Sequence, residues 1–225
     1  MFFSLLKLDL EKFNAYQWQK LVAKNEYHIH RSLVTLFPYP GKTEFLFSED
    51  FENYTDSMGN LSKSPIYYIV SERAPILYSD FLKLEVKSYS PNFNVGQRLN
   101  FFLRANPTMR KSRVNKNIDI FESLKKSFVG TTEELRFKAK NLLYEWLEKR
   151  ANRFGFKIDI DQLNIYNYQH HNFFKKSENR TIHISSVDYG GTLTVIDPDL
   201  FLNAVLHGIG RAQAFGCGLL LVRNI

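Results

Sequence analysis

A tyrosine, a histidine and an arginine stand at helical spacing near residue 30. Tyr27 and His30 are three residues apart, so they would be neighbours on a helix surface, and Arg31 follows directly. Histidine titrates near neutral pH and a neighbouring cation binds phosphate, so the group could move protons at a phosphate ester. The alternative is an ordinary polar helix face. His28 would lie on another side of the helix, where packing or solvent contact is the simpler interpretation.

The second candidate is the glycine-rich stretch 207–222, HGIGRAQAFGCGLLLV. Glycines let backbone N–H groups face an anion, and an arginine among them adds charge. The spacing GxGxxxxxGxG fits neither a dinucleotide fingerprint nor a P-loop. A phosphate cradle and a turn that only allows packing both remain open. The candidate contacts are Gly208, Gly210, Arg211, Gly216 and Gly218.

Lysine and arginine gather in two further clusters, and in the second they are interleaved with Phe173 and Phe174. One surrounds the Asn106-Pro107 turn and the other lies on an expected long hairpin. Such interleaving suits RNA binding, whereas a solvated loop is the plainer alternative for each residue. The candidate RNA contacts are Arg104, Arg110, Lys111 and Arg113 in the first cluster and Lys175, Lys176 and Arg180 in the second.

Metal and cofactor sites have little support. His170, His171 and His183 could suggest a metal, but no cysteine pair or HExxH pattern accompanies them. The single cysteine, Cys217, excludes an internal disulfide and reads as a small buried residue. We therefore expect no metal and no cofactor, and a reducing cytoplasmic setting.

The composition favours a folded protein with a polyanionic partner. The chain has 225 residues, 44% hydrophobic content and a formal net charge of +7. This is enough apolar surface for a core, and the charge puts nucleic acid first among partners, although a generic basic protein would share it. No apolar stretch is long enough to predict a membrane span, and residues 1–13 read as a strand start, not a signal peptide.

The order of the expected elements repeats once. The first half should hold strands at 2–10, 43–53, 65–72 and 81–89, a helix over 10–37 and a weak short element at 75–80. The second should hold strands at 97–106, 156–176, 180–197 and 219–224, helices over 131–154 and 199–207 and an irregular basic segment at 111–117. Both halves approach β-α-β-β-α-β. We predict an α+β protein of two tandem ferredoxin-like, RRM-like domains, 1–90 and 97–225, joined by a linker at 91–96.

Four segments, in this order, resemble one family. They are YHIHRSLVTLFP (27–38), FLFS (45–48), LNFFLRANPTMRK (99–111) and GIGRAQAFGCGLLLV (208–222). Together they resemble the CasE-type CRISPR repeat endoribonucleases of type I-E systems, members of the RAMP superfamily. The resemblance covers essentially the whole chain, and it also implies two ferredoxin-like domains.

The resemblance implies a function and a site. Such enzymes cleave CRISPR precursor RNA at the base of the repeat hairpin without metal, by attack of a 2′-OH on the next phosphate, and stay on the product within Cascade. Counting back from Leu36-Phe37-Pro38 puts the family histidine at His30 and the tyrosine at Tyr27, with His28 the rival if the register slips. Arg31 and the basic and glycine residues above would hold RNA. The division of acid and base roles stays open, and a repeat-binding module without cleavage is the alternative.

Overall fold

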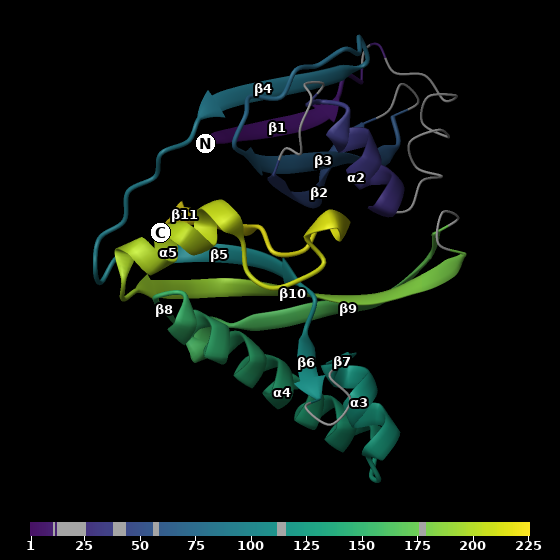
Figure 1. Ribbon diagram of the computed structural model, residues 1–225, viewed down its shortest axis with the longest axis vertical. Helices are drawn as coiled ribbons and strands as arrows, with labels where there is room; N and C mark the ends of the chain where they lie inside the picture. The colour runs from purple at the N-terminus through teal and green to yellow at the C-terminus, as the bar shows by residue number, and fades with distance from the viewer. Residues whose placement is uncertain (11, 13–25, 38–43, 56–58, 112–115, 176–178) are drawn as a thin grey trace. The chain divides into compact units, whose positions relative to one another are not determined.

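The computed structural model in Figure 1 describes the chain except residues 11, 13–25, 38–43, 56–58, 112–115 and 176–178. The chain forms two compact units. The first comprises Met1–Pro91 and Gln213–Leu219, and the second Asn92–Ala212 and Leu220–Ile225. The sequence predicts the second domain as one uninterrupted stretch of chain, 97–225. In the structure, Gln213–Leu219 groups with the first unit instead, because this segment packs on a helix and a strand of that unit.

The first unit holds a four-stranded antiparallel sheet in the order β2-β3-β1-β4. Neighbours β1 and β4 pair Leu6 with Leu84, and β1 and β3 pair Leu6 with Tyr67. This strand order is that of a ferredoxin-like fold. The elements are β1 (Phe2–Leu8), α2 (Glu26–Val34), β2 (Phe45–Thr55), β3 (Leu61–Ser71) and β4 (Leu82–Ser88).

No helix forms between β3 and β4, where a ferredoxin-like fold has its second helix and where we expected only a short element. Both strands are antiparallel to β1, so the ten residues 72–81 must return along its length. Seven strand residues span roughly 20 Å, whereas ten helical residues span only about 15 Å. An extended connection therefore fits the available chain, and Pro75 removes a further helical hydrogen bond.

The core of the first unit lies between α2 and one face of the sheet. Leu33 and Leu36 meet Leu6, Phe47 and Ile69, all nearly or fully buried. Apolar residues recur at helical spacing around Leu33 and Leu36 and alternate with polar ones in the strands. The helix and the strands were therefore recognisable in the sequence. Of the helix expected over 10–37, the structure describes Glu26–Val34 and a following turn to Phe37; residues 11 and 13–25 lie outside the described chain.

The second unit repeats the ferredoxin-like order with additions. Its sheet runs β11-β5-β10-β8, and β9 pairs with the far part of β10. The two tandem ferredoxin-like domains expected from the sequence are thus confirmed. The elements are β5 (Arg98–Ala105), β6 (Thr108–Lys111), β7 (Lys116–Asp119), α3 (Ile120–Ser127), α4 (Thr132–Arg153), β8 (Phe156–Ile158), β9 (Asn164–Lys175), β10 (Arg180–Val195), α5 (Pro198–His207) and β11 (Leu220–Asn224).

Two helices of the second unit begin at caps that the sequence contains. Thr131 caps α4 through a reciprocal capping box with Glu134, as the expected helix start required. Asp119 caps α3, a helix that was not predicted from the sequence. The cap residue followed three positions later by Glu122 is a helix-start pattern that could have revealed it.

The long hairpin of the second unit is more divided than expected. Its first strand is broken by the 3-10 helix η2 (Ile160–Gln162), so β8 and β9 pair with different parts of β10. Figure 1 shows the distal ends of β9 and β10 continuing past β5 and β8 as a two-stranded arm. Among the described residues, no helix is long and apolar enough to cross a membrane.

Candidate active site

His30 lies in the last turns of α2, partly enclosed by aromatic rings. Its imidazole stacks on Phe45 with a centroid distance of 5.2 Å and an interplanar angle of 15°, and a tilted Phe47 ring lies 6.3 Å away. Burial lowers the pKa of His30 below its ordinary value, because the cation loses hydration. The imidazole is therefore neutral at physiological pH and able to accept a proton.

The other candidate residues of this region also lie in α2. Tyr27 lies in α2 one turn before His30, so the helical spacing of the predicted pair is present. Arg31 is exposed in the last turn. His28, the rival, also lies in α2. The catalytic assignment of Tyr27 and His30 stays a prediction.

The glycine-rich stretch is divided between the two units. Gly208 ends α5 and donates its N–H to Ala204, and a Cβ at Gly210 would lie 3.7 Å from the ring of Trp146, all within the second unit. Arg211 is exposed. The following segment, which contains Gly216 and Gly218, belongs to the first unit.

The part in the first unit packs beside the candidate catalytic helix. The 3-10 helix η4 (Gln213–Phe215) contacts α2 and β2. Gly216 has a φ of +74°, and a Cβ there would lie 3.1 Å from Cε2 of Phe47. Glycine is needed for both reasons, because a side chain is strained at this φ and would press on a buried ring. The packing interpretation of the glycines thus holds at Gly216, and a phosphate-binding role for the stretch stays a prediction.

Arg104 forms an ion pair with Asp188 within the second unit. Its guanidinium donates from Nε to Oδ1 of Asp188 at 2.7 Å and from Nη2 to Oδ2 at 3.1 Å, across β5 and β10. Asn167 also donates to Oδ2 of Asp188, whose side chain is 2% exposed. In the structure Arg104 neutralises a buried carboxylate, and its contact with RNA stays a prediction.

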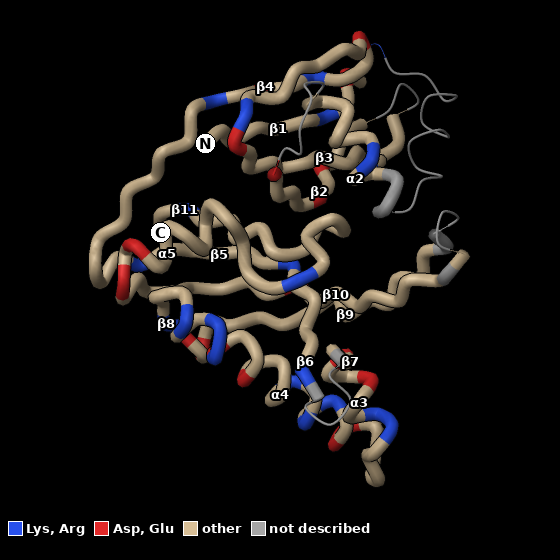
Figure 2. Tube along the Cα trace, viewed as in Figure 1, with Lys and Arg blue, Asp and Glu red and all other residues tan. Residues whose placement is uncertain are grey.

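Four of the other basic candidates, all in described parts of the chain, lie on two hairpins of the second unit. Arg110 and Lys111 are in β6, opposite β7. Lys175 and Arg180 are cross-strand partners at the end of the β9–β10 arm. Arg113 and Lys176 lie outside the described residues. Figure 2 shows lysine and arginine interspersed with acidic residues along α3 and α4.

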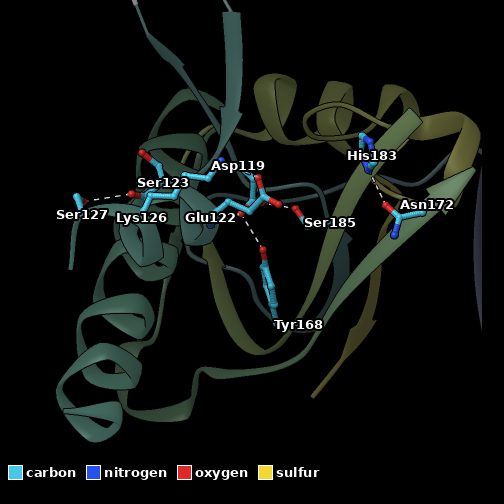
Figure 3. Close-up of polar contacts among 9 residues, drawn as sticks. All are labelled: Asp119, Glu122, Ser123, Lys126, Ser127, Tyr168, Asn172, His183 and Ser185. Carbon is cyan, nitrogen blue, oxygen red and sulfur yellow. Dashed lines mark hydrogen bonds and ion pairs between the residues drawn. The ribbon is translucent and has the colours of Figure 1, made fainter. Parts of the chain in front are cut away.

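Asp119 joins the base of the arm to α3. Its carboxylate caps the helix at Glu122 and accepts hydrogen bonds from Tyr168 at 2.7 Å and from Ser185 (Figure 3). Burial, followed by the bond to Asp119, raises the pKa of Tyr168, so its hydroxyl remains a donor. Sequence analysis did not select Asp119 or Tyr168.

The histidines on the arm have other partners. His171 shares a hydrogen bond with Ser186, and His183 shares one with Asn172 (Figure 3). His170 packs edge-on to Tyr168. Within the described part of the chain, no group of three histidine, cysteine or acidic residues is placed to hold a metal ion. Cys217 is buried, as expected.

Two ferredoxin-like units in tandem, the first bearing a half-buried histidine beside a glycine-rich return segment, define the structural class. The chain belongs to the family described as CRISPR associated protein, whose model matches residues 1–224. This confirms the resemblance stated from the sequence.

Two named relatives are similar to this chain in sequence. The chain is 24% identical over 200 residues to the CRISPR system Cascade subunit CasE of Escherichia coli K12, covering 88% of this chain and 92% of that protein. It is 28% identical over 144 residues, 60% of each chain, to the CRISPR-associated endoribonuclease Cse3 of Thermus thermophilus.

Solved structures share the fold. Thermus thermophilus Cse3 bound to an RNA representing a pre-cleavage complex superposes with a TM-score of 0.67 at 23% identity, covering 99% of this chain and all of that one. Cas6e from Escherichia coli K-12 has a TM-score of 0.60 at 19% identity, with both chains fully covered.

Proposed function

We propose that this chain is a metal-independent endoribonuclease that cleaves CRISPR precursor RNA at the base of the repeat hairpin. The observation that carries the proposal is His30, a partly buried imidazole whose pKa is lowered by burial, on a helix that contacts η4 of the glycine-rich stretch. The protein belongs to the CRISPR associated protein family. One of its relatives is named an endoribonuclease, and another is named a Cascade subunit.

The reaction needs one proton removed and one supplied. The 2′-oxygen of the nucleotide before the cut forms a bond to the adjacent phosphorus, and the bond from phosphorus to the 5′-oxygen breaks. The proton of the 2′-OH passes to the base, and the 5′-oxygen gains a proton. The products are a 2′,3′-cyclic phosphate and a 5′-OH.

His30 suits the role of base because its lowered pKa leaves Nδ1 or Nε2 unprotonated near neutral pH. Tyr27, one turn earlier, would then position or protonate the leaving oxygen. Basic residues of the arm and of the glycine-rich stretch would hold the phosphates of the stem, whose A-form shape offers phosphates and ribose hydroxyls to a protein. Product retention within Cascade, and a cytoplasmic location, belong to the same proposal.

A cleavage assay on the cognate repeat hairpin tests the enzyme against the non-cleaving binder. Cleavage should continue in EDTA and yield the two termini given above. A single 2′-deoxy substitution before the scissile phosphate should block it without loss of binding. Loss of cleavage on chelation, or cleavage of the deoxy substrate, would refute the mechanism.

Variants of α2 test the assignment of the base. His30→Ala should abolish cleavage while RNA affinity is retained, and His28→Ala is the matched control on the same helix. If His28→Ala is inactive and His30→Ala is active, the register of the site is wrong. If both bind RNA and the unmodified protein yields no product, the chain is a repeat-binding module.

A further inference from the structure

Three aromatic rings of the first unit form a stacked row with the imidazole at one end. Phe37 stacks on Phe45 at 5.1 Å and 26°, and Phe45 stacks on His30 at 5.2 Å and 15°. Phe37 is 8% exposed and packed in the core, whereas Phe45 is only partly buried against it. The imidazole thus rests on a support that is anchored at its buried end.

Phe47 connects the same support to the glycine-rich segment. It is 1% exposed and lies 6.3 Å from both Phe45 and His30. Gly216 lies close to the same ring, because a Cβ added to this glycine would be 3.1 Å from Phe47. A shift of Phe47 would therefore be felt at both the histidine and the loop, because close-packed interiors transmit displacement.

We propose that Phe45 is a positioning residue for His30, holding the imidazole in its stacked orientation while Phe47 fixes the glycine-rich segment to the same support. This inference rests on the proposed function. Stacked rings prefer offset parallel arrangements, so Phe45 restricts rotation of the imidazole about its side-chain bonds. Reaction geometry is sensitive to displacements of about 1 Å, which makes such restriction consequential for rate.

Phe45 also excludes water from one face of the imidazole. Burial is the cause of the lowered pKa of His30. The η4 residues packed against α2, Gln213 to Phe215, carry no charge, and Arg31 beside His30 is exposed. Removing the ring should therefore return hydration to the imidazolium and raise the pKa of His30 towards its ordinary value.

The test compares Phe45→Leu, Phe45→Met and Phe45→Tyr, with Phe51→Leu as control. Phe51 lies on the same strand and is 51% exposed. The pKa of His30 is measured by NMR without RNA, and its signal is identified by its loss in His30→Gln. Single-turnover cleavage at saturating RNA is then measured against pH.

Leucine and methionine fill the space without a stacking plane, so both should raise the pKa of His30, move the acidic limb of the rate profile to higher pH and slow the plateau rate about tenfold or more. RNA affinity should be unchanged. Tyrosine keeps the ring and should restore all three properties, and Phe51→Leu should match the unmodified protein.

The proposal is overturned if the folded leucine or methionine variant keeps the original pKa and profile, or if Phe45→Tyr is as defective as Phe45→Leu. Failure of the proposed function has a different signature. In that case no RNA is cleaved by any variant, while the NMR titrations still report whether Phe45 controls the imidazole.

Discussion

At the scale of single residues, Arg104 shows that a basic side chain in a sequence of this kind can be used within the fold. Its two hydrogen bonds neutralise Asp188, which is almost completely removed from water. A carboxylate in that position depends on its cation, because an unpaired buried charge loses hydration without compensation.

Arg104→Ala should therefore lower the free energy of unfolding by about 3–5 kcal/mol. Arg98→Ala is the matched control on the same strand, since Arg98 is 56% exposed and faces Asp159 at 3.5 Å. That exposed pair should contribute less than about 1 kcal/mol. Urea unfolding of both variants measures the difference, and equal losses would show that the buried pair has no special structural role.

His30 and Phe45 differ in how visible they are in a sequence. His30 could be selected because its chemistry and its helical spacing to Tyr27 are local. Phe45 and Phe47 read as ordinary alternating strand residues, and their proximity to His30 arises only when β2 and α2 pack together. The ion pair of Arg104 was not visible in the sequence for the same reason, since its partner is 84 residues away.

At the scale of elements, Gln213–Leu219 is the part of the glycine-rich stretch that belongs to the first unit, and it packs against α2 and β2. Gly216 combines a left-handed backbone with contact to a ring that is 1% exposed. Gly59, also in the first unit, has a φ of +81° but open space around it. The two positions therefore separate the cost of backbone conformation from the cost of contact.

Gly59→Ala should lower the free energy of unfolding by about 1 kcal/mol, through the backbone alone. Gly216→Ala should cost a further ~1–3 kcal/mol, because Phe47 has little room to move. Thermal and urea unfolding compare the two variants. Similar losses would mean that the segment adapts to a methyl group and does not fix its neighbours.

Most of the elements themselves were predictable. Alternation and helical periodicity located the strands of the four- and five-stranded sheets and α4, but not β6 and β7. Pro198 after a capping aspartate located α5. The missing helix between β3 and β4 depends on the distance a connection must cover, which follows from strand pairing. The break at η2 likewise reflects two different partners along β10, which local sequence does not encode.

At the scale of the whole molecule, the net charge of +7 should govern RNA affinity. The logarithm of the association constant should fall linearly with the logarithm of salt concentration, because binding to phosphates releases counterions. Arg211→Gln should reduce the slope by about one if Arg211 contacts a phosphate.

Arg223→Gln is the control, since Arg223 is exposed near the end of β11 and is not among the proposed contacts. It should leave the slope unchanged. Fluorescence anisotropy with the repeat hairpin over a salt series measures both variants. A flat salt response of the unmodified protein would contradict binding through phosphates.

The return of Gln213–Leu219 to the first unit has a consequence for how the protein is made. The piece that rests on α2 and β2 is synthesised more than 120 residues after Pro91. During translation the first sheet can assemble early, but its packing against η4 must wait until Phe215 has been added. A fragment ending at Pro91 would leave Phe47 without the backbone that covers it, so α2 and β2 reach their final packing only after the residues up to Ala212 have been synthesised.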